Sequence, residues 1–506
     1  VAKARSVQVR TAVTCAASVC TRKSPRNQGA TFRFRMQPFR LATVVLSAVL
    51  CVTPATLWPA AFAAQASPVS SGAVDTAASV PPPSPAPPEP DLLAPLLEGM
   101  GFNLGLWGYN RYVADYAFAR ISPATMARNL RGGWEWDADQ FSINQFGHPY
   151  QGGFYHAAAR THGHGFYAAA GYTMLGSLQW EYLMEKEKPS YNDLLTTTLG
   201  GAMFGEISHR LSHAVRDPEA TGAEWLTREV FAAAVNPVGG LHRLMGGRTD
   251  AAGISGEESI RWRVLTGALL PFFSTAAGED PAHSTRVPKS NTELLVLYGD
   301  PFETRAPYDH FILNGGFSLN RHAAATINAR AQLHRFPLFE TGGWRGMVVA
   351  GQSFDYLNNG VYKLGVSGLG AGYAHRRAWP SGLYHSLHFE AGAIPLGGVS
   401  TEFFRKQARN YNLGGGAYTT SRTVVGQNSS WHIALVGDRY WIRTRSGAKG
   451  DELIGFSQLE FAKALRGRLG TALHLASYDR SARYRAHGTR VELTEEVRVM
   501  LTYGWQ

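Results

Sequence analysis

The chain has 506 residues and a formal net charge of +11, but the charge is concentrated at its beginning. Residues 1–66 carry nine lysines and arginines and no acidic residue, so the rest of the chain is close to neutral, which argues against a nucleic-acid-binding role. All three cysteines (Cys15, Cys20 and Cys51) lie in the same segment, so the remainder has no residue for a disulfide or a cysteine metal site.

The first segment has the pattern of a secretory signal. A short basic stretch over 36–40 precedes an apolar run over 41–51, and small residues follow at 61–66. We therefore expect residues 1–66 to be a leader and signal peptide, with the mature chain starting near 64–67.

Residues 67–90 are rich in alanine, serine and proline, and they end in a run dominated by proline. Such a composition favours extended, semi-rigid conformations, so we expect a linker here. No segment after residue 66 is long and apolar enough to predict an inner-membrane helix.

Residues 91–256 are predicted to form a helical domain. Pro149 suits the first turn of a helix, a second helix is expected over 166–186, and Ser190 with Asp193 has the spacing of a capping box that opens a helix ending near Val215.

Small residues are dense in the last two of these helices. Because glycine lets helix backbones approach closely, we expect a tight helical hairpin. The glycines concerned are Gly171, Gly176, Gly200, Gly201 and Gly205.

Beyond residue 257 the apolar residues recur with a period of two, which indicates β-strands. One face of the segment 325–333 carries alanine, isoleucine and leucine, and the opposite face is polar. In the last segment, 491–505, the apolar face is interrupted only by Glu495. Ten further segments show the pattern less cleanly, over residues 260–269, 293–299, 308–319, 344–352, 361–374, 382–394, 409–420, 430–443, 453–465 and 467–478.

A β-sandwich and a lipocalin-like soluble barrel would also alternate. Many of the segments reach about ten residues, the length that a tilted membrane-spanning strand needs, and aromatic residues lie near their ends. The prediction is an α+β chain with an N-terminal helical domain and, over residues 257–506, an antiparallel transmembrane β-barrel of about 12 strands.

Several of these stretches resemble a bacterial family catalogued as domain of unknown function 3943. In the helical half the resemblance lies in 134–150 and 154–160, with Trp180-Glu181, 190–193 and Gly205-Glu206, and in the barrel half it lies in 395–405 and 409–414. It implies a helical segment paired with an outer-membrane barrel, and it implies no activity.

Polar residues gather in the helical domain, where burial without a partner would be costly. The candidates are His148, Arg160, Glu181, Asp193 and Glu206. One interpretation is that they satisfy one another inside the helical domain. The alternative is a divalent-metal or acid/base centre, for which His148, Glu181 and Glu206 are the candidate ligands. His162 and His164 fall in a predicted turn, where we expect them to be solvated.

For nucleophilic catalysis, a barrel strand offers Ser386 and His388 on one face and His385 on the other. No Gly-x-Ser-x-Gly elbow accompanies them. Two functions follow from the sequence. One is a non-enzymatic outer-membrane barrel that serves a structural role or passes small solutes or lipid, with the helical domain on the periplasmic side as a plug or cap of its mouth. The other is a lipid-modifying hydrolase or acyltransferase. The expected partners are outer-membrane lipids and the barrel-assembly machinery, without nucleic acid and with no cofactor other than the metal alternative.

Overall fold

A computed structural model describes residues 90–217, 219–246, 260–274, 289–319, 324–359, 361–428 and 430–504. The predicted signal peptide and the linker up to residue 89 lie outside these ranges.

The described residues before the barrel form seven α-helices and two short helical turns. The α-helices are α2 (Ala94–Tyr112), α3 (Pro123–Arg131), α4 (His148–Thr161), α5 (Phe166–Leu183), α6 (Tyr191–Val215), α7 (Gly222–Val235) and α8 (Pro237–Leu244), and the turns are η1 (Ala117–Ala119) and η2 (Ile143–Gly147). The three helices expected from the sequence correspond to α4, α5 and α6. Within the described ranges, no helix has both the length and the apolar character needed to cross a membrane.

Helix α6 begins with half of the expected capping box. The Ser190 hydroxyl accepts a hydrogen bond from the backbone N–H of Asp193 at 3.2 Å. The backbone N–H of Ser190 instead donates to Oε2 of Glu181 at 2.7 Å. The Asp193 carboxylate is therefore released from the capping role that the spacing suggested.

Glycines bring α4 and α6 into close contact. A Cβ atom added at Gly201 would lie 2.5 Å from the Cα atom of Gly152, and one added at Gly205 would lie 2.4 Å from Cβ of His156. We expected the close helix contact between α5 and α6. These glycines of α6 instead approach α4.

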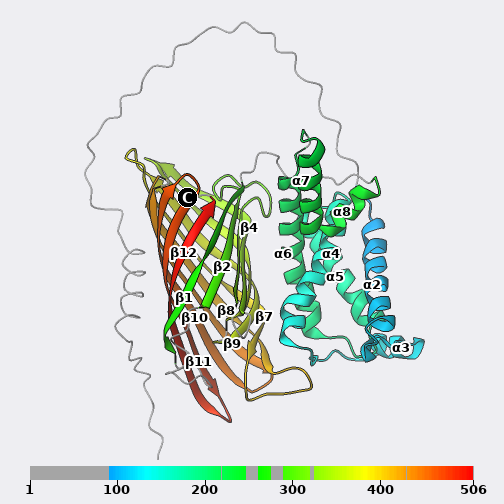
Figure 1. The fold of residues 1–506 in the computed structure, drawn as a ribbon. Coiled ribbons are helices and arrows are strands. Elements are labelled where there is room, and N and C mark those ends of the chain that lie inside the picture. The colour runs from blue at the N-terminus through cyan, green and yellow to red at the C-terminus, as the bar shows by residue number, and fades with distance from the viewer. Residues whose placement is uncertain are drawn as a thin grey trace, which may run out of the picture. The chain divides into compact units, whose positions relative to one another are not determined.

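The rest of the described chain forms a closed antiparallel barrel of twelve strands (Figure 1). The strands are β1 (Ile260–Ser274), β2 (Lys289–Tyr298), β3 (Phe311–Leu319), β4 (Ala324–Thr341), β5 (Trp344–Asn358), β6 (Lys363–Ala378), β7 (Leu383–Ser400), β8 (Tyr411–Gln427), β9 (Trp431–Ser446), β10 (Gly450–Arg466), β11 (Leu469–Tyr484) and β12 (Gly488–Gly504). Each strand pairs with its neighbours in sequence, and β1 pairs with β12 to close the barrel. The predicted fold class is confirmed.

Contacts between distant strands identify the lumen side of the wall. Arg330 on β4 lies 2.7 Å from Asp355 on β5 and 3.4 Å from Asp438 on β9. Since β4 and β9 are not neighbours in the barrel, this contact crosses the lumen. Side chains alternate along a strand, so Phe354 and Tyr356, on either side of Asp355, point outward.

Part of the outer wall is covered by the helical domain. Phe354 is packed edge-to-face on Phe204 of α6 with ring centroids 4.9 Å apart, and Tyr356 lies 5.6 Å from the ring of Phe141. Ala329, on the outward face of β4, is buried in the same hydrophobic core. We expected a plug or cap at the periplasmic mouth. The contacts named above lie on the outer face of the barrel wall.

Candidate functional site

The barrel lumen is lined by buried ion pairs. Arg263 on β1 lies 2.7 Å from Glu460 on β10, and Arg498 on β12 lies close to Glu293 on β2 at 2.5 Å. The His474 ring approaches Glu460 at 3.2 Å. Charges of opposite sign thus face one another across the interior of the barrel.

Two small cavities remain between these side chains. Their volumes are about 160 and 140 Å³, and both are lined by Asn314, Asn328, Arg422 and Asp438. The lumen therefore has room for roughly ten water molecules in each cavity, next to charged side chains.

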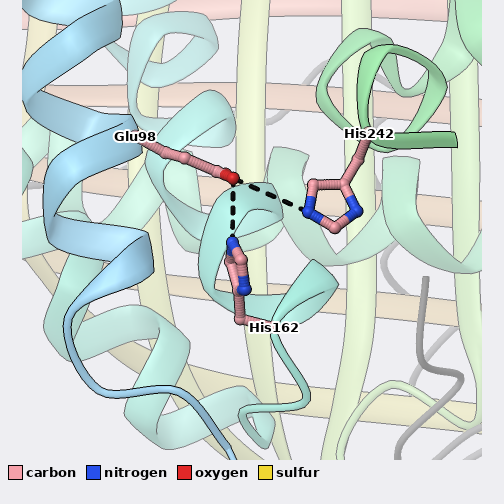
Figure 2. A group of neighbouring side chains, drawn as sticks. All are labelled: Glu98, His162 and His242. Atoms are coloured by element: carbon pink, nitrogen blue, oxygen red, sulfur yellow. Dashed lines mark hydrogen bonds and ion pairs between the residues drawn. The ribbon is translucent and has the colours of Figure 1, made fainter. Parts of the chain in front are cut away.

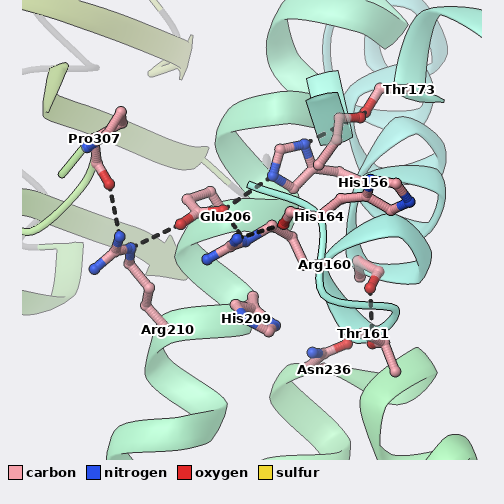
Figure 3. A network of polar contacts seen from close by, with 12 residues as sticks. His156, Arg160, Thr161, His164, Thr173, Glu206, His209, Arg210, Asn236 and Pro307 are labelled. Carbon is pink, nitrogen blue, oxygen red and sulfur yellow. Dashed lines mark hydrogen bonds and ion pairs between the residues drawn. The ribbon is translucent and has the colours of Figure 1, made fainter. Parts of the chain in front are cut away.

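A second buried ion network centres on Glu206 in the helical domain (Figure 3). Its Oε2 atom lies 2.8 Å from Nε of Arg160 and 3.1 Å from Nε2 of His156. Its Oε1 atom lies 2.8 Å from Nε of Arg210. Arg210 also reaches the loop between β2 and β3, where Nη1 lies 3.0 Å from Oδ1 of Asp309.

The charges of this network balance. Burial opposes the charge of Glu206, but Arg160, with His156 and Arg210, holds the pKa of this carboxyl below its ordinary value. Burial lowers the pKa of His156, which favours the neutral ring. Two carboxylates, Glu206 and Asp309, thus face two guanidiniums, so the network fastens α6 to α4 and to the barrel.

A separate polar cluster lies at the other end of α6. Oδ1 of Asp137 accepts hydrogen bonds from the amides of Asn144 and Asn192, each at 2.7 Å. The Asn192 amide also donates to Oδ1 of Asp193 at 2.7 Å. Nε2 of His148 lies 3.4 Å from the same Asp193 oxygen.

Burial favours the uncharged forms in this cluster. It raises the pKa of Asp193, an effect to which nearby Asp137 adds, and it lowers the pKa of His148 to about 4. Burial, with Glu185 beside it, also raises the pKa of Glu181. The contact between His148 and Asp193 is therefore between groups that resist ionisation, unlike the Glu206 network.

The five residues singled out from the sequence are all buried, but they do not form one site. Glu206 and Arg160 belong to the first network, His148 and Asp193 belong to the second cluster, and Glu181 accepts the Ser190 N–H. The proposed metal ligands His148, Glu181 and Glu206 are thus separated. In the part of the chain that the structure describes, the carboxylate and imidazole side chains that meet as a group of three potential metal ligands are a different set.

The polar cluster also connects the helical domain to the barrel. The Asn144 amide donates to the Tyr411 hydroxyl, and Nη1 of Arg409 donates to the backbone carbonyl of Asp137 at 2.7 Å. These four residues lie in the two stretches, 134–150 and 409–414, that carry the family resemblance. These two hydrogen bonds therefore join a stretch of the helical domain and a stretch of the barrel that both carry the resemblance.

The strand residues considered for catalysis are divided between the two faces of the wall. His388 lies 3.6 Å from Glu390, whose side chain lines a lumen cavity. His385 lies 3.3 Å from His375 and 3.1 Å from the Thr423 hydroxyl, on the opposite face.

Sequence reasoning did not place His156, Arg210 or Asp309 beside Glu206, although they complete its network. Arg210 lies four residues after Glu206, a helical spacing that predicts contact. No local signal in the sequence indicates the partnership with Asp309, which lies 99 residues further along the chain.

The comparison with protein families agrees with the resemblance noted above. A family described as a domain of unknown function (DUF3943) matches residues 133–238. The comparison with curated proteins found no match.

Solved structures similar to this chain are bacterial outer-membrane barrels. The NanC porin is 9% identical, with 48% of this chain and 99% of the porin covered and a TM-score of 0.26. Omp33 of Acinetobacter baumannii is 8% identical, with 50% and 100% covered and a TM-score of 0.18. OccK2 of Pseudomonas aeruginosa is 11% identical, with 50% and 99% covered and a TM-score of 0.19. Likeness at this level carries no argument about function.

Proposed function

Since the chain carries a DUF3943 domain over residues 133–238, and that family brings no activity with it, we propose a function from the geometry of the chain itself. The protein is an outer-membrane β-barrel whose role is structural: the barrel spans the membrane and holds the helical domain against its outer wall.

The membrane assignment rests on the outward face of the barrel. Val499, Leu501 and Tyr503 on β12 are more than half exposed, while Arg498 between two outward residues is buried in the lumen. Phe461 on β10 and Trp441 on β9 are also exposed. An apolar outer face around a charged interior is the pattern of a barrel surrounded by lipid.

The helical domain adds to the apolar surface. Large apolar side chains are exposed on α2, α5 and α7, among them Leu104, Met174, Leu226 and Phe231. Glu206, Arg160 and Arg210 lie inside the helical domain instead. This distribution supports a domain that meets lipid or a further apolar surface.

We infer that the chain passes from the helical domain into β1 at the periplasmic end of the barrel. Strand β1 begins at the end of the barrel where β12 finishes. Two-residue turns, 342–343 and 467–468, connect strands at this end. Short turns are typical of the periplasmic end of outer-membrane barrels.

The ion pairs in the lumen favour a role as a membrane anchor over a role as an open pore. The Arg330–Asp438 pair crosses the lumen, and Arg263 and Arg498 are paired with acids on other strands. Passage of solutes larger than water would require these pairs to separate.

Cell fractionation tests the membrane assignment. The protein is expected in the outer-membrane fraction, resistant to extraction at high pH, and its migration in detergent gels should change on heating, as that of closed barrels does. Recovery in the soluble periplasm would exclude the proposal.

Conductance tests the anchor role. Wild-type protein in planar bilayers should show no steady open-pore current, whereas Arg330→Ala should raise conductance by removing the side chain that crosses the lumen. A large steady current from the wild type would show a pore and contradict the anchor role while leaving the membrane assignment intact.

A further inference from the structure

Three potential metal ligands meet in the helical domain where α2, α8 and the end of α4 come together (Figure 2). Glu98 comes from α2, His162 directly follows α4, and His242 comes from α8. Nε2 of His162 lies 2.8 Å from Oε1 of Glu98, and Nε2 of His242 lies 3.7 Å from the same oxygen. All three ligand atoms fall within 4.8 Å of one another.

This spacing suits one small cation. Ligand atoms at about 2 Å from a tetrahedral zinc lie about 3.3 Å from each other, a value between the two observed distances. The imidazole rings of His162 and His242 are 5.1 Å apart and nearly perpendicular, so both can direct a nitrogen at a common point without stacking. Only small side-chain adjustments are needed to close the triad on a metal.

The third residue is not accounted for by hydrogen bonding alone. His162 makes a hydrogen bond to Glu98, but His242 has only the longer 3.7 Å approach. Nε2 of His242 thus faces a carboxylate that is already bonded to His162, and a cation shared by the three groups would explain this arrangement.

Neighbouring contacts hold the turn that carries His162 against the start of α2. Helix α4 ends at Thr161, and the turn that follows is fixed by His164, whose Nε2 lies 2.8 Å from the backbone carbonyl of Asp91. The Asp91 carboxylate in turn accepts the backbone N–H of Ala94 at 3.0 Å at the start of α2. Both histidines of this turn, which we expected to be solvated, are therefore partnered.

We propose that Glu98, His162 and His242 form a binding site for a divalent cation of the zinc class. Two imidazoles and one carboxylate are a ligand set that zinc uses with a fourth, open position for water. The three side chains are between 15% and 33% exposed, so that fourth position is reachable from solvent. The bound cation would join α2, α4 and α8. This site is independent of the proposed membrane function.

Zinc titration of the full chain tests the proposal. Cys15, Cys20 and Cys51 are replaced by serine to remove competing thiolates, and metal-stripped protein in detergent is titrated with Zn²⁺ alone. We expect one equivalent bound per chain. Glu98→Gln and His242→Asn should each weaken binding by about tenfold or more, since even residues behind the ligands have effects of this size.

The matched control is His487→Asn, which removes an exposed histidine from the turn between β11 and β12. It should bind Zn²⁺ like the parent, and all variants should keep the parent's helical signal and heat-modifiable migration. If a triad variant fails to fold, Co²⁺ bound to the parent supplies the test, because a tetrahedral site with nitrogen ligands gives strong visible absorption that Zn²⁺ abolishes. Absence of stoichiometric binding by the parent, or equal affinity of Glu98→Gln and the His487 control, would overturn the proposal.

Discussion

The Glu206 network makes the sharpest prediction about stability. Glu206→Gln keeps the shape of the side chain but removes the negative charge that faces Arg160 and Arg210, all three of which are at least 98% buried. Removing one partner from a buried ion pair costs about 3–5 kcal/mol, because the remaining charge stays desolvated. Arg210 retains Asp309 at 3.0 Å. The main loss therefore falls on Arg160, and we expect a destabilisation of about 3 kcal/mol, the lower end of this range.

The measurement is urea-induced unfolding of the purified full chain, followed by the helical signal in circular dichroism at neutral pH. Glu224→Gln is the control, since it removes a carboxylate from an exposed pair with Arg228 at a spacing of four residues. Such a pair contributes less than about 1 kcal/mol. If Glu206→Gln lost no more stability than Glu224→Gln, the network would not hold the helical domain together and the reasoning would be refuted.

Four other substitutions test separate parts of the structure. Val499→Arg should reduce barrel assembly by about 2–4 kcal/mol because it places a charge on the lipid face, whereas Thr502→Ala in the lumen should be mild; equal losses of heat-modifiable protein would contradict the membrane assignment. Ala329→Arg should release the helical domain to protease while the barrel keeps its heat-modifiable migration, and an unchanged digestion pattern would argue against docking at this face. Gly201→Ala should lower stability to urea by about 1–3 kcal/mol because the added methyl group meets the backbone of α4, and a neutral effect would show that the helices separate freely. Burial lowers the pKa of His148 to about 4, below the value of about 6.5 in an unfolded chain, so the unfolded state binds a proton first as the pH falls. The free energy of unfolding should therefore decrease by up to about 3 kcal/mol as the pH is lowered from about 6.5 to about 4. His148→Gln should flatten this pH dependence of the urea midpoint, and an identical dependence in the variant would contradict the prediction.

The strands were predictable because the barrel buries only one face of most of them. Alternation over 491–505 predicted β12, with Glu495 as the outward exception that the structure retains. The predicted segment 344–352 ends before β5 does, and the residues from Gly351 to Leu357 are all buried. Both faces are covered there, one by the lumen and one by the helical domain, so burial no longer alternates although polar and apolar residues still do.

The site was harder to predict because its partners are distant in the sequence. Burial of Glu206 followed from its apolar neighbours, but the choice of Arg210 and Asp309 as partners depends on how α6 lies against the barrel. The same is true of Glu98, His162 and His242, which three helices bring together. A capping motif such as Ser190 with Asp193 indicates where a helix starts, but it does not indicate that Glu181 takes over half of the capping role.

Docking of the helical domain on the outer wall is the central claim, and one cross-link tests it most directly. A Cβ atom added at Gly365 would lie 2.6 Å from Cβ of Gln145, and Gly365 pairs with the outward Tyr356. Disulfides need Cβ atoms about 3.5–4.5 Å apart, so a small shift would accommodate one. In a chain without its three native cysteines, Gln145→Cys with Gly365→Cys should form a disulfide in isolated outer membranes, detected as a linked peptide pair by mass spectrometry. Gln145→Cys with Val366→Cys, whose side chain faces the lumen, should not. A link to position 366 and none to position 365 would place the helical domain inside the barrel and contradict the account.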